Sequence, residues 1–94
     1  MRASLETLVA VAETYGESKA SEGRWWASRS YDEFTGDMTI TVGHHATVML
    51  NVTAGVVVPL SKGYGSMTDK CGIRKVLKNV TGQGYAEVYK DFVY

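Results

Sequence analysis

Cysteine and proline are almost absent from this chain, and so is any excess of charge of one sign. Its 94 residues include one cysteine, one proline and ten charged residues of each sign. The single cysteine, Cys71, excludes an intramolecular disulfide framework and fits a reducing cytoplasm, which is where we expect the protein to reside. A net charge of zero excludes both a strongly basic nucleic-acid clamp and an acidic mimic of DNA. Apolar runs such as Val56–Val58 are far too short to cross a membrane, so no membrane partner is expected.

The remaining composition is that of an ordinary folded domain. Hydrophobic residues make up 45% of the chain and charged residues 21%, which argues against disorder. A chain of this length is expected to form one domain, residues 1–94, with a core that gives a modest margin of stability. The charges are unevenly distributed: residues 1–37 hold seven acidic and four basic residues, and residues 38–94 hold three acidic and six basic. This asymmetry is compatible with a charged partner.

Two helices are predicted from apolar residues that recur every three or four positions. Ser4 can cap the first helix, whose apolar stripe consists of Leu5, Leu8, Val9 and Ala12. Residues 16–23 lose the periodicity, which indicates a fraying last turn or a loop. Thr68 is expected to cap the second helix, with Asp69 in its first turn. The buried stripe of that helix is predicted to be Ile73, Val76, Leu77 and Val80.

Strands are predicted between the helices, where apolar and polar residues alternate over residues 25–30, 38–42, 46–52 and 56–60, and again near the end over residues 85–89. The residues expected to face inward are Met38, Ile40, Val42, Val48, Leu50, Val52, Val56, Val58 and Leu60. Turns are expected at Gly43-His44-His45 and, as a three-residue hairpin, at Thr53-Ala54-Gly55. Pro59 indicates an edge strand, because proline lacks a backbone donor. The sequence therefore predicts an α+β fold, an antiparallel sheet of four to five strands with two helices on one face.

A contiguous basic stripe is predicted along the second helix, at Lys70, Arg74, Lys75 and Lys78. Such a stripe is compatible with a solvated surface, with an acidic protein partner or with nucleic-acid phosphates. Trp25 and Trp26 are adjacent in a predicted strand, so their rings face opposite sides, and we expect one of them to be exposed. Exposed aromatic residues are enriched in protein interfaces, and Tyr64 is a further candidate. These seven residues form the predicted partner-binding set.

The segment before the second helix offers a weaker candidate site. Backbone N–H groups at a helix start attract anions, and Ser66, Thr68 and Lys62 could assist. The spacing of a P-loop is absent, and a simple helix cap explains the same residues.

No catalytic residue, metal site or cofactor is predicted. His44 and His45 lie at a predicted turn, far in sequence from Cys71, and no carboxylate is spaced to complete a metal site. A nucleophilic pair of Cys71 with either histidine lacks an evident third orienting group. The acidic residues Asp32, Glu33 and Asp37 cluster in one polar segment typical of a soluble turn. We therefore predict that the protein is not an enzyme.

Residues 45–80 resemble small uncharacterised proteins of tailed bacteriophages. In those proteins a His-x-Thr strand and a short hairpin lead to a glycine-rich loop that opens a helix, and the matching residues here are His45, Thr47, Gly63, Tyr64, Ser66, Thr68, Asp69, Lys70, Ile73 and Leu77. The resemblance implies a phage-type accessory protein that inhibits or modulates a host protein or a defence complex in the host cytoplasm. The alternative is a nucleic-acid or nucleotide-binding module that uses the basic face of the second helix.

Self-association as a homodimer is also expected. A chain this short, with no net charge and an apolar edge strand at residues 56–60, gains core by pairing. Pro59 argues against pairing through that edge.

Overall fold

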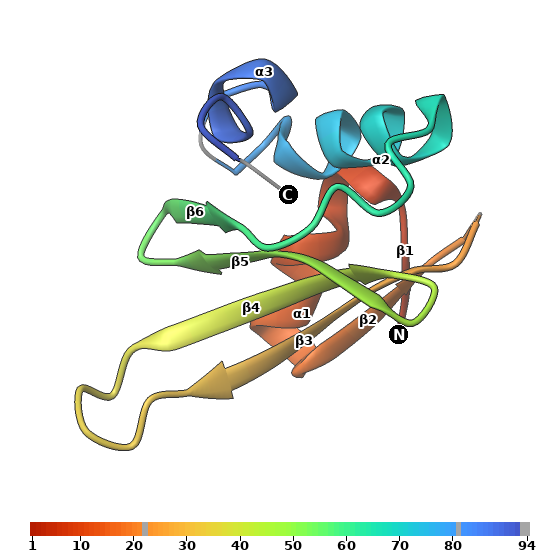
Figure 1. Cartoon of the computed structure of the whole chain (residues 1–94). Coiled ribbons are helices and arrows are strands. Elements are labelled where there is room, and N and C mark those ends of the chain that lie inside the picture. Colours follow the sequence, from red (N-terminus) through yellow and green to blue (C-terminus); the bar gives the residue numbers. More distant parts are fainter. Residues whose placement is uncertain (22, 81, 93–94) are drawn as a thin grey trace.

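The computed structural model describes residues 1–21, 23–80 and 82–92, and it shows an α+β fold built on a six-stranded sheet (Figure 1). The strands lie across the sheet in chain order, from β1 to β6. β1 and β2 are parallel, and the other four pairings are antiparallel. The bounds are β1 Arg2–Ala3, β2 Glu17–Ala20, β3 Trp25–Tyr31, β4 Met38–His44, β5 Thr47–Thr53 and β6 Val56–Pro59. The predicted fold class is confirmed, but the sheet has more strands than the four to five predicted.

The helical segments in the described residues are η1 Leu5–Thr7, α1 Leu8–Tyr15, α2 Met67–Leu77 and α3 Tyr85–Val88. Ser4 precedes η1 but makes no side-chain cap to the backbone. Its hydroxyl instead pairs with that of Thr7 at 2.8 Å, so the predicted role of Ser4 as a cap is wrong. Within the described part of the chain, no helix has the length and hydropathy needed to cross a membrane.

β2 occupies part of the segment that the sequence predicted to be a loop or a frayed helix end. α1 stops at Gly16, whose φ of 92° is a left-handed conformation that glycine adopts without strain. The chain then continues at once as a strand in which Ser18 and Ala20 are buried. The Ser18 hydroxyl donates to the carbonyl of Leu8 at 2.7 Å, which satisfies a buried polar group at the same time.

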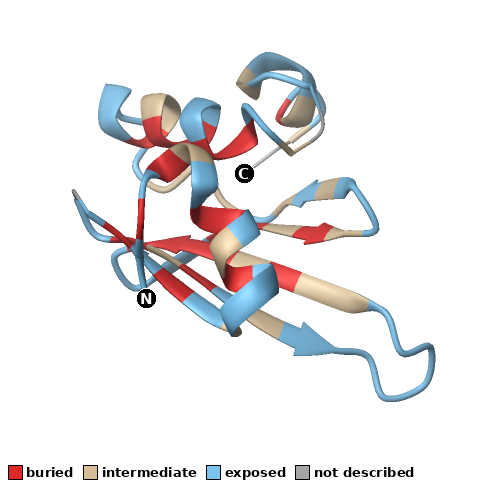
Figure 2. Ribbon diagram, turned by 180° about the vertical axis from the view of Figure 1, so that it is seen from behind, coloured by how far each residue is buried: buried red, intermediate tan, exposed pale blue. Residues whose placement is uncertain are grey.

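One face of the sheet carries the core. α1 contacts β2, β3 and β4, and α2 packs against η1 and against the ring of Trp25 in β3. The buried stripes of both helices join one cluster with inward residues of the sheet, as the red bands on α1, α2 and the strands show (Figure 2). The members of this cluster from the two helices and the three central strands are Leu8, Val9, Ala12, Trp25, Ala27, Ile40, Val42, Met49, Leu50, Val52, Ile73, Val76 and Leu77. The predicted packing of two helices on one face is therefore observed.

A β-bulge in β5 changes which residues face inward. Val42 pairs with Leu50 and the next residue, Gly43, pairs with Val48, so Met49 is an extra residue without a partner on β4. Met49 and Leu50 are both fully buried, whereas Val48 is 37% exposed. The prediction that Val48 faces inward, opposite Met49, is wrong because simple alternation does not survive a bulge.

The hairpins are tighter than predicted. Thr53 pairs with Val56, which leaves a two-residue turn at Ala54-Gly55 in which both residues have positive φ. This register places Val57 against the core and leaves Val56, Val58 and Leu60 exposed, the reverse of the prediction. β6 is an edge strand, as Pro59 predicted.

The β4–β5 turn also starts later than predicted. β4 includes His44, and the turn begins at His45, whose φ is 56°. His44 therefore has the regular inward position of a strand residue and not the free orientation of a turn residue.

The segment predicted as a last strand is the short helix α3. Its apparent alternation comes from Tyr85 and Tyr89, which are four residues apart and stack with ring centroids 4.8 Å apart. Glu87 accepts a hydrogen bond from the Gly84 N–H at 2.6 Å and so caps the helix start. The buried Tyr89 hydroxyl lies 2.8 Å from the carbonyl oxygen of Met49 and 2.9 Å from that of Ser61, which fixes α3 beside the sheet.

Candidate functional site

The start of α2 is organised by Ser66 and Asp69. Ser66 is the N-cap: its hydroxyl oxygen accepts the Asp69 N–H at 3.2 Å. The Asp69 carboxylate in return accepts the N–H of Ser66 at 3.3 Å and its hydroxyl at 2.9 Å, which completes a capping box. Thr68 is an exposed residue of the first helical turn, so the prediction that it caps α2 is wrong.

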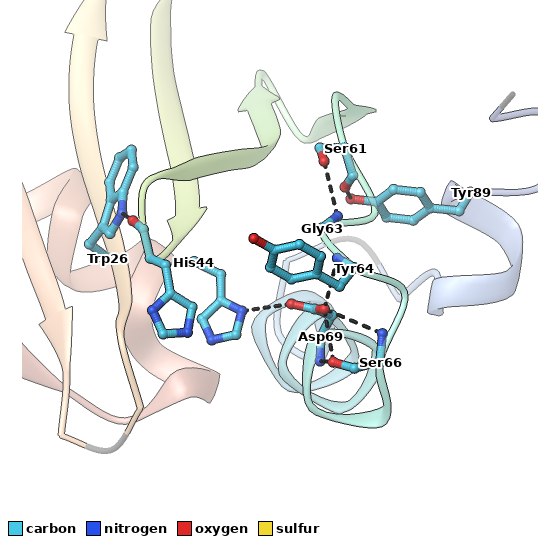
Figure 3. Close-up of polar contacts among 9 residues, drawn as sticks. Trp26, His44, Ser61, Gly63, Tyr64, Ser66, Asp69 and Tyr89 are labelled. Carbon is cyan, nitrogen blue, oxygen red and sulfur yellow. Dashed lines mark hydrogen bonds and ion pairs between the residues drawn. The ribbon is translucent and has the colours of Figure 1, made fainter. Parts of the chain in front are cut away.

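Asp69 also fixes the preceding loop, residues 61–66. Its carboxylate accepts the N–H of Tyr64 at 3.2 Å. At the other end of the loop, the Ser61 hydroxyl accepts the N–H of Gly63 at 2.9 Å, and the Ser61 carbonyl is bound by Tyr89 (Figure 3). We predicted that backbone N–H groups at this helix start could bind an external anion. Those of Tyr64 and Ser66 instead donate to the carboxylate of Asp69. The ammonium group of Lys62 lies 6.0 Å from the centroid of the Phe92 ring.

A buried His44–Asp69 pair connects β4 to α2. The Nδ1 atom of His44 lies 2.7 Å from the Asp69 Oδ1 atom, and the side chains are only 7% and 4% exposed (Figure 3). Burial by itself would raise the pKa of the Asp69 carboxyl, but hydrogen bonds from His44, Ser66 and Tyr64 together outweigh it and hold that pKa below its ordinary value. Asp69 is therefore an ionised buried group with every oxygen bonded, which makes it an organising centre for the loop.

The His44 ring is also held by aromatic contacts. It stacks on the Trp25 ring, with centroids 4.3 Å apart and planes at 7°. The His45 ring also contacts it, tilted by 40° at a centroid distance of 4.4 Å. The ionised Asp69 carboxylate can only accept, so the Nδ1–H group of His44 donates to it and Nε2 is the ring nitrogen left for another contact. No hydrogen-bond partner for Nε2 is found in residues 1–21, 23–80 and 82–92.

The cleft beside this pair has a volume of about 370 Å³ and is lined by residues that include His44, His45, Thr47 and Tyr64. Cys71 does not line it; the thiol belongs to a separate cavity of about 380 Å³ bordered by Trp25 and Met67. The structure thus places Cys71 and the two histidines in different cavities. Among the described residues, no group of three histidine, cysteine or acidic side chains is placed to hold a metal ion.

The predicted partner-binding residues separate into two surfaces and the core. Trp25 is buried, and Trp26 lies half-buried on the opposite face of β3. The other five gather around α2: Tyr64 is 97% exposed, Lys70 is half-buried, and Arg74, Lys75 and Lys78 are exposed. Met67, which the sequence did not single out, is 66% exposed in the same region. We call Tyr64, Met67, Lys70, Arg74, Lys75 and Lys78 the α2 surface.

The electrostatic character of the α2 surface follows from the burial of Asp69. Asp69 is the one acidic residue of α2, and it faces His44 in the interior. Lys70, Arg74 and Lys78 form no ion pair with any residue that the structure describes. The exposed side of α2 therefore presents cations, an aromatic ring and a thioether with no acidic residue among them.

Comparisons with models of known protein families, with curated proteins and with solved structures give no match for this chain.

Proposed function

We propose that this chain is a small binding protein that inhibits or modulates another protein through contacts made by the α2 surface. The observation that carries the proposal is the presentation of Tyr64: its side chain is 97% exposed while its backbone N–H is bound by the buried Asp69 carboxylate. A fixed loop with an exposed aromatic ring loses little conformational entropy when a partner binds it. Tyrosine, methionine and arginine are also the residue types that protein interfaces favour.

The chemistry of the partner follows from the surrounding charge. An acidic protein surface complements the cations of the α2 surface, and their positive field would steer its approach. The resemblance of residues 45–80 to phage proteins supports a host protein or a defence complex as the partner, with the host cytoplasm as the setting. Binding and not catalysis is the activity that we propose.

Substitution of the α2 surface tests this function. Tyr64→Ala is expected to weaken partner binding about 30-fold, as loss of an interface hot spot does. Arg74→Glu with Lys78→Glu is expected to weaken it about tenfold or more at low salt, because the approach of an acidic partner becomes repulsive. The measurement is capture of host proteins from a nuclease-treated lysate, followed by titration of the purified partner.

The matched control reverses two exposed cations outside α2, Lys19→Glu with Lys90→Glu. It changes the net charge of the chain by the same amount as the α2 double variant. It should leave the affinity for the partner within a factor of about three, since exposed charges far from an interface contribute little to binding. Equal weakening by both double variants would remove the α2 surface as the binding site.

A nucleic-acid module is the second candidate, because the cations of the α2 surface also suit phosphates. Four phosphate contacts would lower the affinity on the order of 10²-fold between about 50 and 200 mM salt. An aromatic-centred protein interface would lose much less. The salt dependence of the α2-dependent binding therefore distinguishes the two candidates.

Self-association remains a separate proposal, with light scattering as its test. We expect a mass near twice the 10.3 kDa of the monomer, through the exposed valines of β6. In the β5–β6 hairpin, hydrogen-bonded and non-hydrogen-bonded residue pairs alternate along the strands. The backbone groups of Val57 and Pro59 therefore point to the open edge of the sheet, where Pro59 has no N–H to donate.

Val58→Lys should restore the monomer mass, whereas Ser30→Lys on β3 should not. A monomer mass for the unaltered chain at every concentration would end the idea.

A further inference from the structure

A third cavity is lined by none of the residues of the α2 surface. It has a volume of about 600 Å³ and opens where the β1–β2 edge meets the β2–β3 loop and the β4–β5 turn. Its lining includes Arg2, Lys19, Arg24, Trp26 and His45. Cavities of 300–1,000 Å³ are the usual size of small-ligand sites, so this cavity is large enough for a small ligand.

Trp26 supplies a fixed aromatic surface in this cavity. Its indole Nε1–H donates to the carbonyl oxygen of His45 at 2.7 Å (Figure 3). One side of the ring lies directly over Gly43 of the neighbouring strand, where a Cβ atom would come within 2.1 Å of the ring. The ring is therefore held flat on the sheet before any ligand arrives. A planar group stacking on it would cost little reorganisation.

The same cavity gathers positive charge. Lys19 is the direct cross-strand neighbour of Trp26, so their side chains rise from the same face. The side chains of Lys19 and Arg24 have no hydrogen-bond or ion-pair partner in the part of the chain that the structure describes. Arg2 donates through Nη1 to the carbonyl oxygen of Ala20 at 3.4 Å, which holds its guanidinium at the cavity wall. None of the described lining residues is acidic.

We propose that this cavity binds a nucleotide unit, with the base stacked on Trp26 and the phosphate held by Lys19, Arg24 and Arg2. Stacking of the base and binding of the phosphate are carried by different residues. An aromatic ring fixed beside a cluster of unpaired cations fits a ligand that joins a planar base to an anion, and base stacking on aromatic residues tolerates any base. Arginine and lysine both bind phosphate, and arginine does so with a directed pair of donors.

The site is distinct from the basic stripe of α2. Its cations come from β1, β2 and the β2–β3 loop, and its aromatic ring comes from β3. A nucleotide bound here would therefore depend on none of the α2 cations. The unit could belong to a free nucleotide or to the end of a single strand, since both present a base and a phosphate.

Equilibrium dialysis of the full chain tests the proposal with adenosine monophosphate, uridine monophosphate, adenosine and inorganic phosphate. Both monophosphates should bind, and each more tightly than adenosine or phosphate alone. Lys19→Ala with Arg24→Ala should weaken binding of the monophosphates by about tenfold or more, because two charge-assisted contacts are lost. Trp26→Leu should weaken it by roughly 5- to 100-fold, the loss of one stacking contact. Arg74→Ala with Lys78→Ala is the matched control and should leave it unchanged.

The remaining outcomes are equally decisive. A short oligothymidylate that binds far more tightly than the monophosphates and displaces them identifies a single strand as the source, whereas equal affinity identifies a free nucleotide; both support the site. No binding of any nucleotide at about 1 mM, or equal weakening by the α2 control, overturns it. Circular dichroism confirms the fold of Trp26→Leu, and the variant with Lys19 and Arg24 replaced keeps the test valid if that fold is lost, because both residues are exposed.

Discussion

Asp69→Ala is expected to lower the free energy of unfolding by about 3–5 kcal/mol, because it removes a buried hydrogen-bond acceptor and part of a helix cap together. The substitution leaves His44 in the interior without its partner at 2.7 Å. It also removes the acceptor for the N–H groups of Tyr64 and Ser66 and for the Ser66 hydroxyl. The loss should therefore combine an unpaired buried imidazole with an unfixed loop and a weakened helix start.

Urea denaturation followed by circular dichroism measures this change. Asp69→Asn keeps an oxygen acceptor of similar shape and should lose less than Asp69→Ala. Asp91→Ala removes an exposed carboxylate near the C-terminus and should stay within about 0.5 kcal/mol of the unaltered protein. A loss below about 1 kcal/mol for Asp69→Ala would show that the pair does not organise the fold.

The same carboxylate gives the expected pH dependence. The pKa of Asp69 is lower in the folded protein than its ordinary value, which is about 3.9 in an unfolded chain. Its stabilising contribution is therefore complete above that value and is lost as the pH falls through the lower, folded-state pKa. The stability difference between the unaltered protein and Asp69→Asn should narrow in this acidic range and be constant above about pH 5.

The sequence predicted the parts of the fold that depend on local periodicity. The apolar stripe of α1, the residues Ile73, Val76 and Leu77 of α2 and the alternation in β4 lie where expected, because both patterns report directly which face is buried. Val80 was predicted to extend the α2 stripe, but the helix ends at Leu77 and Val80 is only half-buried. The elements that the sequence failed to predict are short, and the inward side chains of one of them are small. β2 has four residues, and its inward positions are Ser18 and Ala20, which carry almost no hydrophobic signal. α3 has four residues as well, and two stacked tyrosines mimic strand alternation.

The strand registers could not be predicted from periodicity, because register depends on turns. Two positive-φ residues at Ala54-Gly55 make a two-residue turn and reverse the faces of β6. The bulge opposite Val42 and Gly43 does the same for Val48. Gly43 lacks a side chain, and this is what lets the Trp26 ring lie on the sheet. The glycine could not be interpreted in this way from the sequence, because the pairing of Trp26 with Gly43 is known only from the structure.

Of the buried His44–Asp69 pair, the position of His44 could have been predicted from the sequence. His44 continues the inward series of Met38, Ile40 and Val42, so extending the strand by two residues would have placed it in the interior. A buried imidazole then requires a polar partner. The identity of that partner could not be deduced, because Asp69 is 25 residues away and looks like an ordinary first-turn acid.

Gly72→Ala is expected to destabilise the protein by about 3 kcal/mol, although the same change inside an ordinary helix stabilises by roughly 0.5–1 kcal/mol. A Cβ atom at position 72 would lie 2.1 Å from Cζ2 of Trp25, 2.4 Å from Cε2 and 2.7 Å from Nε1. The indole has little freedom to retreat, because its ring is 3% exposed and stacks on His44. α2 would have to move away from β3, and the His44–Asp69 contact would lengthen with it.

Thermal unfolding measures the effect, since each kcal/mol lowers the Tm of a domain of this size by about 4–8 °C. The control is a double-mutant cycle with Trp25→Leu, which removes the ring that the new methyl group meets. If the close approach is the cause, Gly72→Ala should cost much less in the Trp25→Leu background than in the unaltered protein. An equal cost in both backgrounds would locate the strain elsewhere in α2, and a rise in Tm would mean that helix propensity outweighs the contact. We expect destabilisation because Gly72, the glycine of α2, is the residue against which the Trp25 ring of the core packs.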